Sequence, residues 1–187
     1  MLKKIHHQVE RLSSKKGIII LFLLAHSVLG MMMIFTFSRI NDRLGTQAFD
    51  LKTFGYSESE ALSMLQNLDP ATIDFYIFPQ LLLLDVLYPV LLALFLSAVI
   101  IRLSILLKLS RDQVYSNLFL LPFFAMVSDY MENVMILLMI KNPTDPSLIV
   151  IQVASILTQM KGVFTMISWV IILILLTIWL TNKRKED

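Results

Sequence analysis

Residues 17–38 read GIIILFLLAHSVLGMMMIFTFS, a run of 22 residues without a formal charge. About 20 apolar residues are enough for an α-helix to cross the hydrocarbon core of a bilayer. The run is longer than the roughly 7–15 residues of a secretory signal core, and no small-residue cleavage site follows it. We therefore predict an uncleaved membrane-spanning helix over residues 17–38.

Three further apolar stretches are long enough to span a membrane. They are residues 76–101, 115–140 and 147–181. Hydrophobic residues make up 57% of the 187-residue chain and charged residues only 16%. A soluble domain carries about 25% charged residues. The sequence thus predicts an all-α, polytopic membrane protein with four transmembrane helices, in which residues 1–187 form a single membrane domain.

The basic residues predict the orientation. Residues 1–16, the loop 102–114 and the tail 182–187 hold eleven of the 16 Lys and Arg residues, whereas the loops 39–75 and 141–146 hold four. Cytoplasmic segments are enriched in Lys and Arg, so we expect both termini in the cytoplasm. The even number of spans agrees with this orientation. We predict a multi-pass protein of the plasma (inner) membrane.

The first outer loop, residues 39–75, is too long to be a simple connection. Within it, Ser57 and Glu60 have the S-x-x-E spacing of a capping box at the start of a helix. Apolar residues then recur at helical spacing: Ala61, Leu62, Leu65 and Leu68. This pattern predicts a short amphipathic helix. It either lies on the outer membrane surface, caps the bundle, or acts as a lid over a site beneath it.

Several functional classes are excluded by composition. The chain has no cysteine, which excludes disulfides, thiolate metal sites and a cysteine nucleophile. The net charge of +2 gives no reason to expect nucleic-acid binding. A zinc site is not expected, because His26 is the only histidine in a predicted span. Asp85, Asp129 and Glu132 offer oxygen ligands to Mg²⁺ or Ca²⁺, but Lys161 nearby would oppose such a site. We therefore expect no metal and no cofactor.

Four charged residues lie within, or at the edge of, the predicted spans: Asp85, Asp129, Glu132 and Lys161. On insertion scales a charge near the bilayer centre costs at least ~2.5–3.5 kcal/mol. Such residues therefore usually face the interior of a bundle and have partners. The helix rise places the acids in the middle to outer half of the membrane, so we expect any cavity among them to open toward the outer loop.

Two polar faces are predicted on the third and fourth spans. Asp129, Glu132 and Asn133 are related as i, i+3 and i+4, which places them on one face of a helix. Another polar stripe recurs at helical spacing: Thr158, Lys161, Thr165 and Ser168. In a small bundle we expect these two polar faces to meet.

Three carboxylates and one ammonium cannot all stay charged in a dry interior without excess negative charge. Water, an ion or a protonated carboxyl must balance it. We hypothesise that this cluster binds a small amphiphilic or lipidic ligand. The proposed ligand-binding residues are Asp85, Asp129, Glu132, Asn133 and Lys161.

Three alternatives remain open at this point. One is a membrane enzyme in which Asp129 or Glu132 is the catalytic proton donor to a lipid. Another is a proton-coupled transporter subunit that uses either acid as its proton carrier. The last is a membrane assembly factor in which the cluster only fixes the packing of the helices. The lipid bilayer is the expected partner in every case, and the oligomeric state is left open.

The polar residues also carry a resemblance to a known family. The motifs are Asp50 with Gly55-Tyr56, Tyr76, Asp85-Val86-Leu87-Tyr88-Pro89, Asp129-Tyr130-Met131-Glu132-Asn133 and Lys161. They resemble an uncharacterised family of four-helix integral membrane proteins, with an Asp followed by an aromatic-Pro pair in helix two and D-x-x-E-N in helix three. Residues 68–72 depart from the Gly-Arg pair of that family. The resemblance implies the topology and the choice of polar residues, and no activity.

Overall fold

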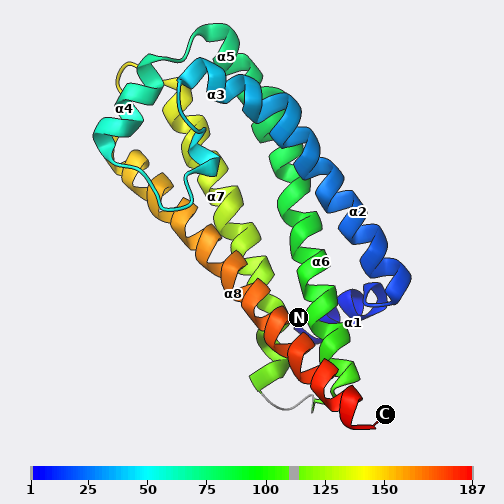
Figure 1. Ribbon diagram of the computed structural model, residues 1–187. Coiled ribbons are helices and arrows are strands. Elements are labelled where there is room, and N and C mark those ends of the chain that lie inside the picture. Colours follow the sequence, from blue (N-terminus) through cyan, green and yellow to red (C-terminus); the bar gives the residue numbers. More distant parts are fainter. Residues whose placement is uncertain (1, 110–113, 187) are drawn as a thin grey trace.

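The computed structural model describes residues 2–109 and 114–186, and this part of the chain is all-helical. It contains four helical segments long and apolar enough to cross a membrane: Lys15–Leu44, Pro70–Leu106, Asn117–Lys141 and Leu148–Arg184. Figure 1 shows them packed side by side as an elongated bundle, with the two ends of the chain near the same end of the bundle. Each of these segments covers most of one predicted span.

The first long segment consists of α2 (Lys15–Met31), the wide-turn segment η1 (Met32–Phe37) and α3 (Ser38–Leu44). It begins where the Ser14 side chain accepts a hydrogen bond from the Gly17 N–H at 3.0 Å. It ends at Gly45, whose φ of 67° is the left-handed conformation that glycine adopts readily after a helix. The helix thus continues beyond the apolar run that predicted it, because polar residues extend it at both ends.

The second long segment consists of α5 (Pro70–Phe75), η3 (Tyr76–Leu84) and α6 (Asp85–Leu106). A proline has no N–H to donate and disfavours a helical conformation in the residue before it. Accordingly, Phe78 is extended before Pro79, with φ −137° and ψ 124°. After this break Gln80 is completely buried. The segment therefore carries a kink close to the polar residues of the bundle.

The other long helices pair along their length. They are α7 (Leu121–Lys141), preceded by η4 (Val114–Leu120), and α8 (Leu148–Glu186). α6 runs to Leu106, inside the predicted inner loop 102–114, and residues 110–113 of that loop lie outside the described residues. α6 contacts α2, α7 and α8, so it forms the centre of the bundle.

The basic N-terminal segment is also helical. α1 (Leu2–Leu12) lies across the end of the bundle, as Figure 1 shows. Its Val9 is only 2% exposed and belongs to a core with Leu103 and Phe119. The spacing of Ile5, Val9 and Leu12 is the signal that would have predicted this helix.

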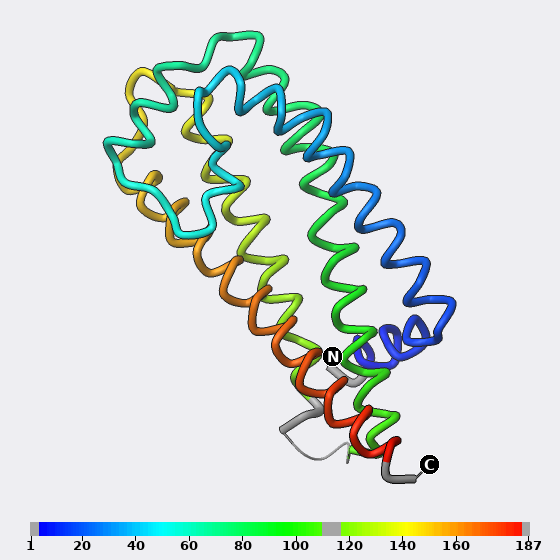
Figure 2. Tube along the Cα trace, viewed as in Figure 1, coloured from blue at the N-terminus to red at the C-terminus, as the bar shows by residue number. Residues whose placement is uncertain are grey.

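The connection from residue 45 to residue 69, called the long loop below, folds back against the bundle. It carries η2 (Phe49–Leu51) and α4 (Glu58–Gln66), which begins where the Ser57 side chain accepts from the Glu60 N–H at 3.2 Å. Figure 2 shows the chain before α4 returning toward the middle of the bundle. The loop is therefore part of the folded core and not a surface connection.

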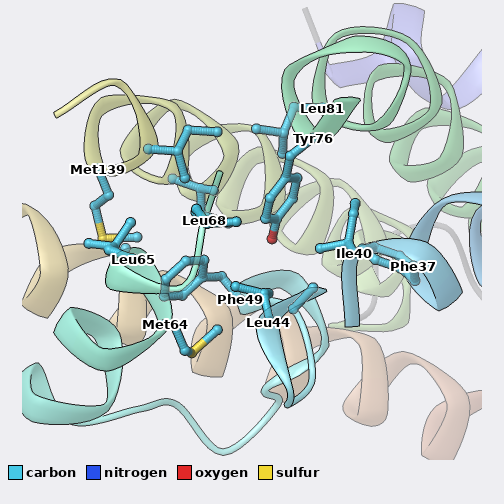
Figure 3. Close-up of a cluster of buried hydrophobic side chains, with 14 of the residues drawn as sticks. Phe37, Ile40, Leu44, Phe49, Met64, Leu65, Leu68, Tyr76, Leu81 and Met139 are labelled. Carbon is cyan, nitrogen blue, oxygen red and sulfur yellow. The ribbon is translucent and has the colours of Figure 1, made fainter. Parts of the chain in front are cut away.

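An apolar cluster holds the long loop in place. Figure 3 shows Phe49 and the α4 residues Met64 and Leu65 in one cluster with side chains from the long helices. Tyr76 is completely buried in the same cluster, and its hydroxyl points into the space between these elements. Burial of a large apolar side chain contributes about 1.5–3 kcal/mol, so this cluster is the main force that docks the loop.

Large apolar side chains cover the outside of the bundle. In the most apolar 18-residue stretch of the fourth segment only 17% of the residues are buried, and in that of the first segment only 22%. Phe35, Ile149 and Met166 are each more than 60% exposed. An exterior this apolar is unusual for a protein that is surrounded by water.

Candidate binding site: a buried polar cluster

Polar side chains gather in the interior near the long loop, and we refer to them as the polar cluster. Its members are Thr36, Asp50, Tyr56, Tyr76, Gln80, Asp85, Asp129, Glu132, Asn133, Thr158 and Lys161. All of them are at least nine-tenths buried except Lys161, whose side chain is 18% exposed. The five residues predicted as ligand-binding are all in this cluster.

Lys161 connects α7 and α8. Its Nζ lies 3.1 Å from Asp129 Oδ1 and 2.6 Å from Glu132 Oε2. Thr158, one turn earlier on α8, donates a hydrogen bond to Glu132 Oε1 at 2.6 Å. The predicted meeting of the two polar faces is therefore confirmed.

Asp85 and Asn133 connect α6 and α7 through a backbone carbonyl. Pro89 has no N–H, so the carbonyl oxygen of Asp85, four residues earlier, lacks its usual partner within the helix. The Asn133 amide donates to this oxygen at 3.4 Å. One turn away, Tyr130 donates to the Val86 carbonyl oxygen at 2.7 Å. The Asp-x-x-x-Pro spacing thus creates an acceptor on α6 that α7 uses.

A double-mutant cycle tests this assignment. Asn133→Ala should destabilise the protein by about 1–3 kcal/mol, because it leaves the Asp85 carbonyl oxygen buried and unpaired. In a Pro89→Ala background the new N–H restores an intrahelical partner, so the same change should cost less. The measurement is the free energy of unfolding of the four proteins. Equal costs of Asn133→Ala in both backgrounds would show that proline does not create this acceptor.

Two irregular segments extend the network from Asp85 toward the first helix. The Gln80 amide in η3 donates to Asp85 Oδ2 at 2.9 Å. Thr36 in η1 donates to Gln80 Oε1 at 2.5 Å. Neither residue was predicted as part of the site. Gln80 could have been recognised as a site residue because it is a lone amide within an apolar span. Nothing in the sequence distinguished Thr36 from the other threonines.

The long loop adds a further acid that was not predicted as a site residue. Asp50, in η2, is 8% exposed and accepts a hydrogen bond from the Tyr76 hydroxyl. It also interacts with the Asp85 carboxyl and lies within electrostatic range of Glu132 and Lys161. Asp50 was one of the motif residues of the family resemblance, and that was the only signal in the sequence.

Close packing fixes the loop against α8. Ser155 on α8 accepts from the Tyr56 N–H and donates to the Tyr56 carbonyl oxygen, both at 2.9 Å. Gly55 has a φ of 81°, and a Cβ there would lie 2.7 Å from Ser155 Oγ. On the same face of α8, a Cβ on Gly162 would lie 2.7 Å from Thr53 Cγ2. Two glycines therefore allow the backbone of the loop to reach the helix.

Tyr56 brings a phenol to the polar cluster. Burial, with the Glu132 and Asp50 carboxylates adding to it, raises the pKa of Tyr56 well above its usual value. The phenol therefore stays protonated throughout the neutral range. The loop thus contributes one acid and one neutral phenol to the cluster.

An ion pair within the long loop joins the segment before α4 to the first turn of α4. Lys52 Nζ lies 2.6 Å from Glu60 Oε1, and this hydrogen bond lowers the pKa of the Glu60 carboxyl below its usual value. A lowered folded-state pKa stabilises the protein above the unfolded-state pKa, and this stabilisation is lost as the pH falls through the folded-state value. Because the Glu60 side chain is 43% exposed, we expect only about 0.2–1 kcal/mol.

This pH dependence can be tested with Lys52→Met. At pH 6 the variant should unfold at a lower temperature than the native protein. The difference should shrink as the pH is lowered from about 5 to about 3, because Glu60 becomes protonated in both proteins. A difference that stays constant across this range would mean that Lys52 acts through packing and not through its charge.

The polar cluster contains every orphaned side-chain atom found in the described residues. Four buried polar atoms have no hydrogen-bond partner there: Asp50 Oδ1, Tyr56 Oη, Glu132 Oε2 and Asn133 Oδ1. Glu132 Oε2 has only its ion pair with Lys161. Buried polar groups are almost always hydrogen-bonded, so unpaired atoms gathered at one place indicate a site that takes up another group.

A small cavity of about 20 Å³ adjoins Asp129 and Lys161, between α6, α7 and α8. This is room for about one water molecule. The cavity extends toward Pro122 and Thr165, away from the long loop, which fills the other side of the cluster. This cavity therefore does not open toward the loop 39–75, where we expected an opening. The long loop docks on the other side of the cluster because its apolar side chains pack against the long helices.

The donor set of the cluster does not suggest a metal centre. Among the described residues, no group of three or more His, Cys, Asp and Glu side chains has the arrangement of a metal site. Lys161 already occupies the space between Asp129 and Glu132. The side chains of the cluster can form hydrogen bonds and ion pairs and can exchange protons among carboxyl groups.

No protein-family model, curated protein or solved structure matches the chain. The family resemblance described above therefore stays a prediction that rests on its motifs.

Proposed function

We propose that the chain is an integral membrane protein that binds the polar end of a small amphiphilic or lipidic ligand in its polar cluster. The ligand-binding residues are Asp85, Asp129, Glu132, Asn133 and Lys161. The observation that carries the proposal is the gathering of orphaned buried polar atoms in this cluster. A ligand with polar groups would satisfy them.

The membrane setting rests on the four apolar segments and on the apolar exterior of the bundle. Four crossings place both termini on one side, and the positive-inside rule makes that side the cytoplasm of the plasma (inner) membrane. The polar cluster then lies within the thickness of the bilayer. A ligand that reaches the cluster from the lipid phase must have a hydrophobic part as well as a polar end. We therefore propose an amphiphile.

Entry of the ligand requires part of the long loop to move. The cavity of about 20 Å³ is far smaller than ligand pockets, which are about 300–1,000 Å³. The loop covers the cluster. Besides the apolar cluster that docks it, its contacts with α8 include the Tyr56–Ser155 hydrogen bonds and the close approach at two glycines. In our proposal α4 is an amphipathic lid that moves away from the cluster when the ligand binds, while η2 stays in place through the hydrogen bond between Tyr76 and Asp50.

The proposal is tested by native mass spectrometry of the protein extracted from its own membrane. We expect a specifically retained lipid or amphiphile on the native protein. The ligand should be lost in Asp129→Asn and in Glu132→Gln, because these changes remove charges from the site but preserve the shape of the side chains. Asp42→Asn is the matched control, since Asp42 is exposed on α3. Retention of the same ligand by all variants, or clean native protein, would contradict the proposal.

A further inference from the structure

We infer that the polar end of the ligand is a protonated amine that is held by Asp50 and Asp85. This inference rests on the proposed function and specifies its ligand. It is carried by the placement of these two carboxyl groups, by the surplus of acids over bases in the polar cluster, and by the chemistry of the orphaned atoms.

The cluster has more acids than its own lysine can neutralise. Asp50, Asp85, Asp129 and Glu132 supply four carboxyl groups, and Lys161 supplies the only ammonium group among the described members of the cluster. Lys161 is already paired with Asp129 and Glu132. The acids without a basic partner are therefore Asp50 and Asp85.

These two acids lie together. The carboxyl groups of Asp50 and Asp85 interact electrostatically, and side chains of η3 bind both of them. Their other partners are neutral, since Asp50 accepts from the Tyr76 hydroxyl and Asp85 from the Gln80 amide. Two neighbouring buried carboxylates repel each other unless a positive charge lies between them. An ammonium group from the ligand would supply that charge.

The orphaned atoms select for a hydrogen-bond donor. Asp50 Oδ1 and Asn133 Oδ1 are unpaired and can only accept, and Tyr56 Oη can accept as well as donate. Glu132 Oε2 is already held by Lys161 at 2.6 Å. An ammonium group has three donors and no acceptor. A carboxylate or phosphate headgroup would bring more acceptors and more negative charge into a site that already has a surplus of both. The chemistry therefore favours an amine over a fatty acid or a phospholipid.

The experiment uses the full-length protein in a neutral maltoside detergent and four probes with the same alkyl chain. The probes are dodecylamine, dodecanol, dodecanoate and dodecyltrimethylammonium. Affinity is measured by titration calorimetry, and the unfolding temperature is recorded with and without each probe. We expect dodecylamine to bind at least about tenfold more tightly than dodecanol, because hydrogen bonds to charged groups are the stronger class. Dodecanoate should bind most weakly.

The quaternary probe tests whether the ligand needs an N–H donor, and the variants test whether Asp50 and Asp85 hold it. Dodecyltrimethylammonium has the charge but no N–H donor, so it should bind more weakly than dodecylamine. The Asp50→Asn, Asp85→Asn double variant should lose the preference for the amine, whereas Asp42→Asn should keep it. The unfolding temperature without a probe establishes that the double variant is folded, and the comparison of probes on the native protein does not depend on any variant.

The outcomes distinguish this inference from the proposed function. If dodecanol, dodecanoate or the quaternary probe binds the native protein as tightly as dodecylamine, the inference is wrong but the amphiphile site stands. If the double variant keeps its full preference for the amine, the assignment to Asp50 and Asp85 is wrong. If none of the four probes binds, the proposed function itself fails.

Discussion

Lys161→Met is expected to destabilise the protein by about 3–5 kcal/mol, because removing one partner of a buried ion pair leaves the others charged and unpaired. Here the change would strand two acids, Asp129 at 3.1 Å and Glu132 at 2.6 Å from the lost Nζ. Methionine fills a similar volume, so the effect reports mainly on charge. The free energy of unfolding can be measured by titration with a denaturing detergent in mixed micelles.

Two comparisons make the Lys161 experiment decisive. Lys141→Met is the matched control, because Lys141 is exposed at the end of α7, and it should change stability by less than about 0.5 kcal/mol. Adding Asp129→Asn and Glu132→Gln to Lys161→Met removes the stranded charges and should recover part of the loss. If Lys161→Met is as mild as Lys141→Met, the two acids do not depend on Lys161 for their stability.

The second large effect is expected at Gly55, where the long loop touches α8. Gly55→Ala should cost about 1–2 kcal/mol for a side chain in the left-handed conformation. Overpacking against Ser155 and Gln159 should add about 1–3 kcal/mol. The variant should therefore have a lower unfolding temperature, and the long loop should be cleaved faster in limited proteolysis.

Gly45→Ala provides the matched control for Gly55→Ala. Gly45 also has a positive φ, 67°, but a Cβ there would meet nothing within 4 Å. It should therefore show the backbone strain without the overpacking, and the loop should stay as resistant to protease as in the native protein. Equal effects of the two substitutions would mean that the loop is not held by close contact with α8.

Both experiments bear on whether the polar cluster only holds the helices together or also binds a ligand. A polar network that only fixed the helices would be expected to satisfy all its members, since unpaired buried groups are costly. In this protein Lys161, Thr158 and Asn133 make the contacts between the helices, while Asp50 Oδ1, Tyr56 Oη and Asn133 Oδ1 have no partner. Two of these three atoms belong to the long loop, so the unsatisfied part of the cluster includes the loop as well as α7.

Part of the site was predictable because it depends on local geometry. The i, i+3, i+4 spacing of Asp129, Glu132 and Asn133 determines that they share one face of α7. The cost of charge in hydrocarbon then makes Lys161 the partner that this face requires. Asp85 was identified for the same reason. These inferences need only the helix period and the solvent.

The rest of the site depends on contacts between distant parts of the chain. Tyr56 and Ser155 are 99 residues apart, and Thr36 and Gln80 are 44 residues apart. No periodicity within one segment specifies such pairs. Asp50 had the appearance of an ordinary loop acid because its burial depends on how Phe49 and α4 pack.

By itself, the sequence determined four long apolar helices and the charged residues that they cannot leave unpartnered, because hydrophobic length and the cost of a buried charge are local properties. Only the tertiary structure decided that the long loop enters the bundle, adds Asp50 to the polar cluster and closes it from one side. That outcome depends on the packing of apolar side chains from several segments and on glycines that allow close approach. The fit of these surfaces exists only once the chain has folded.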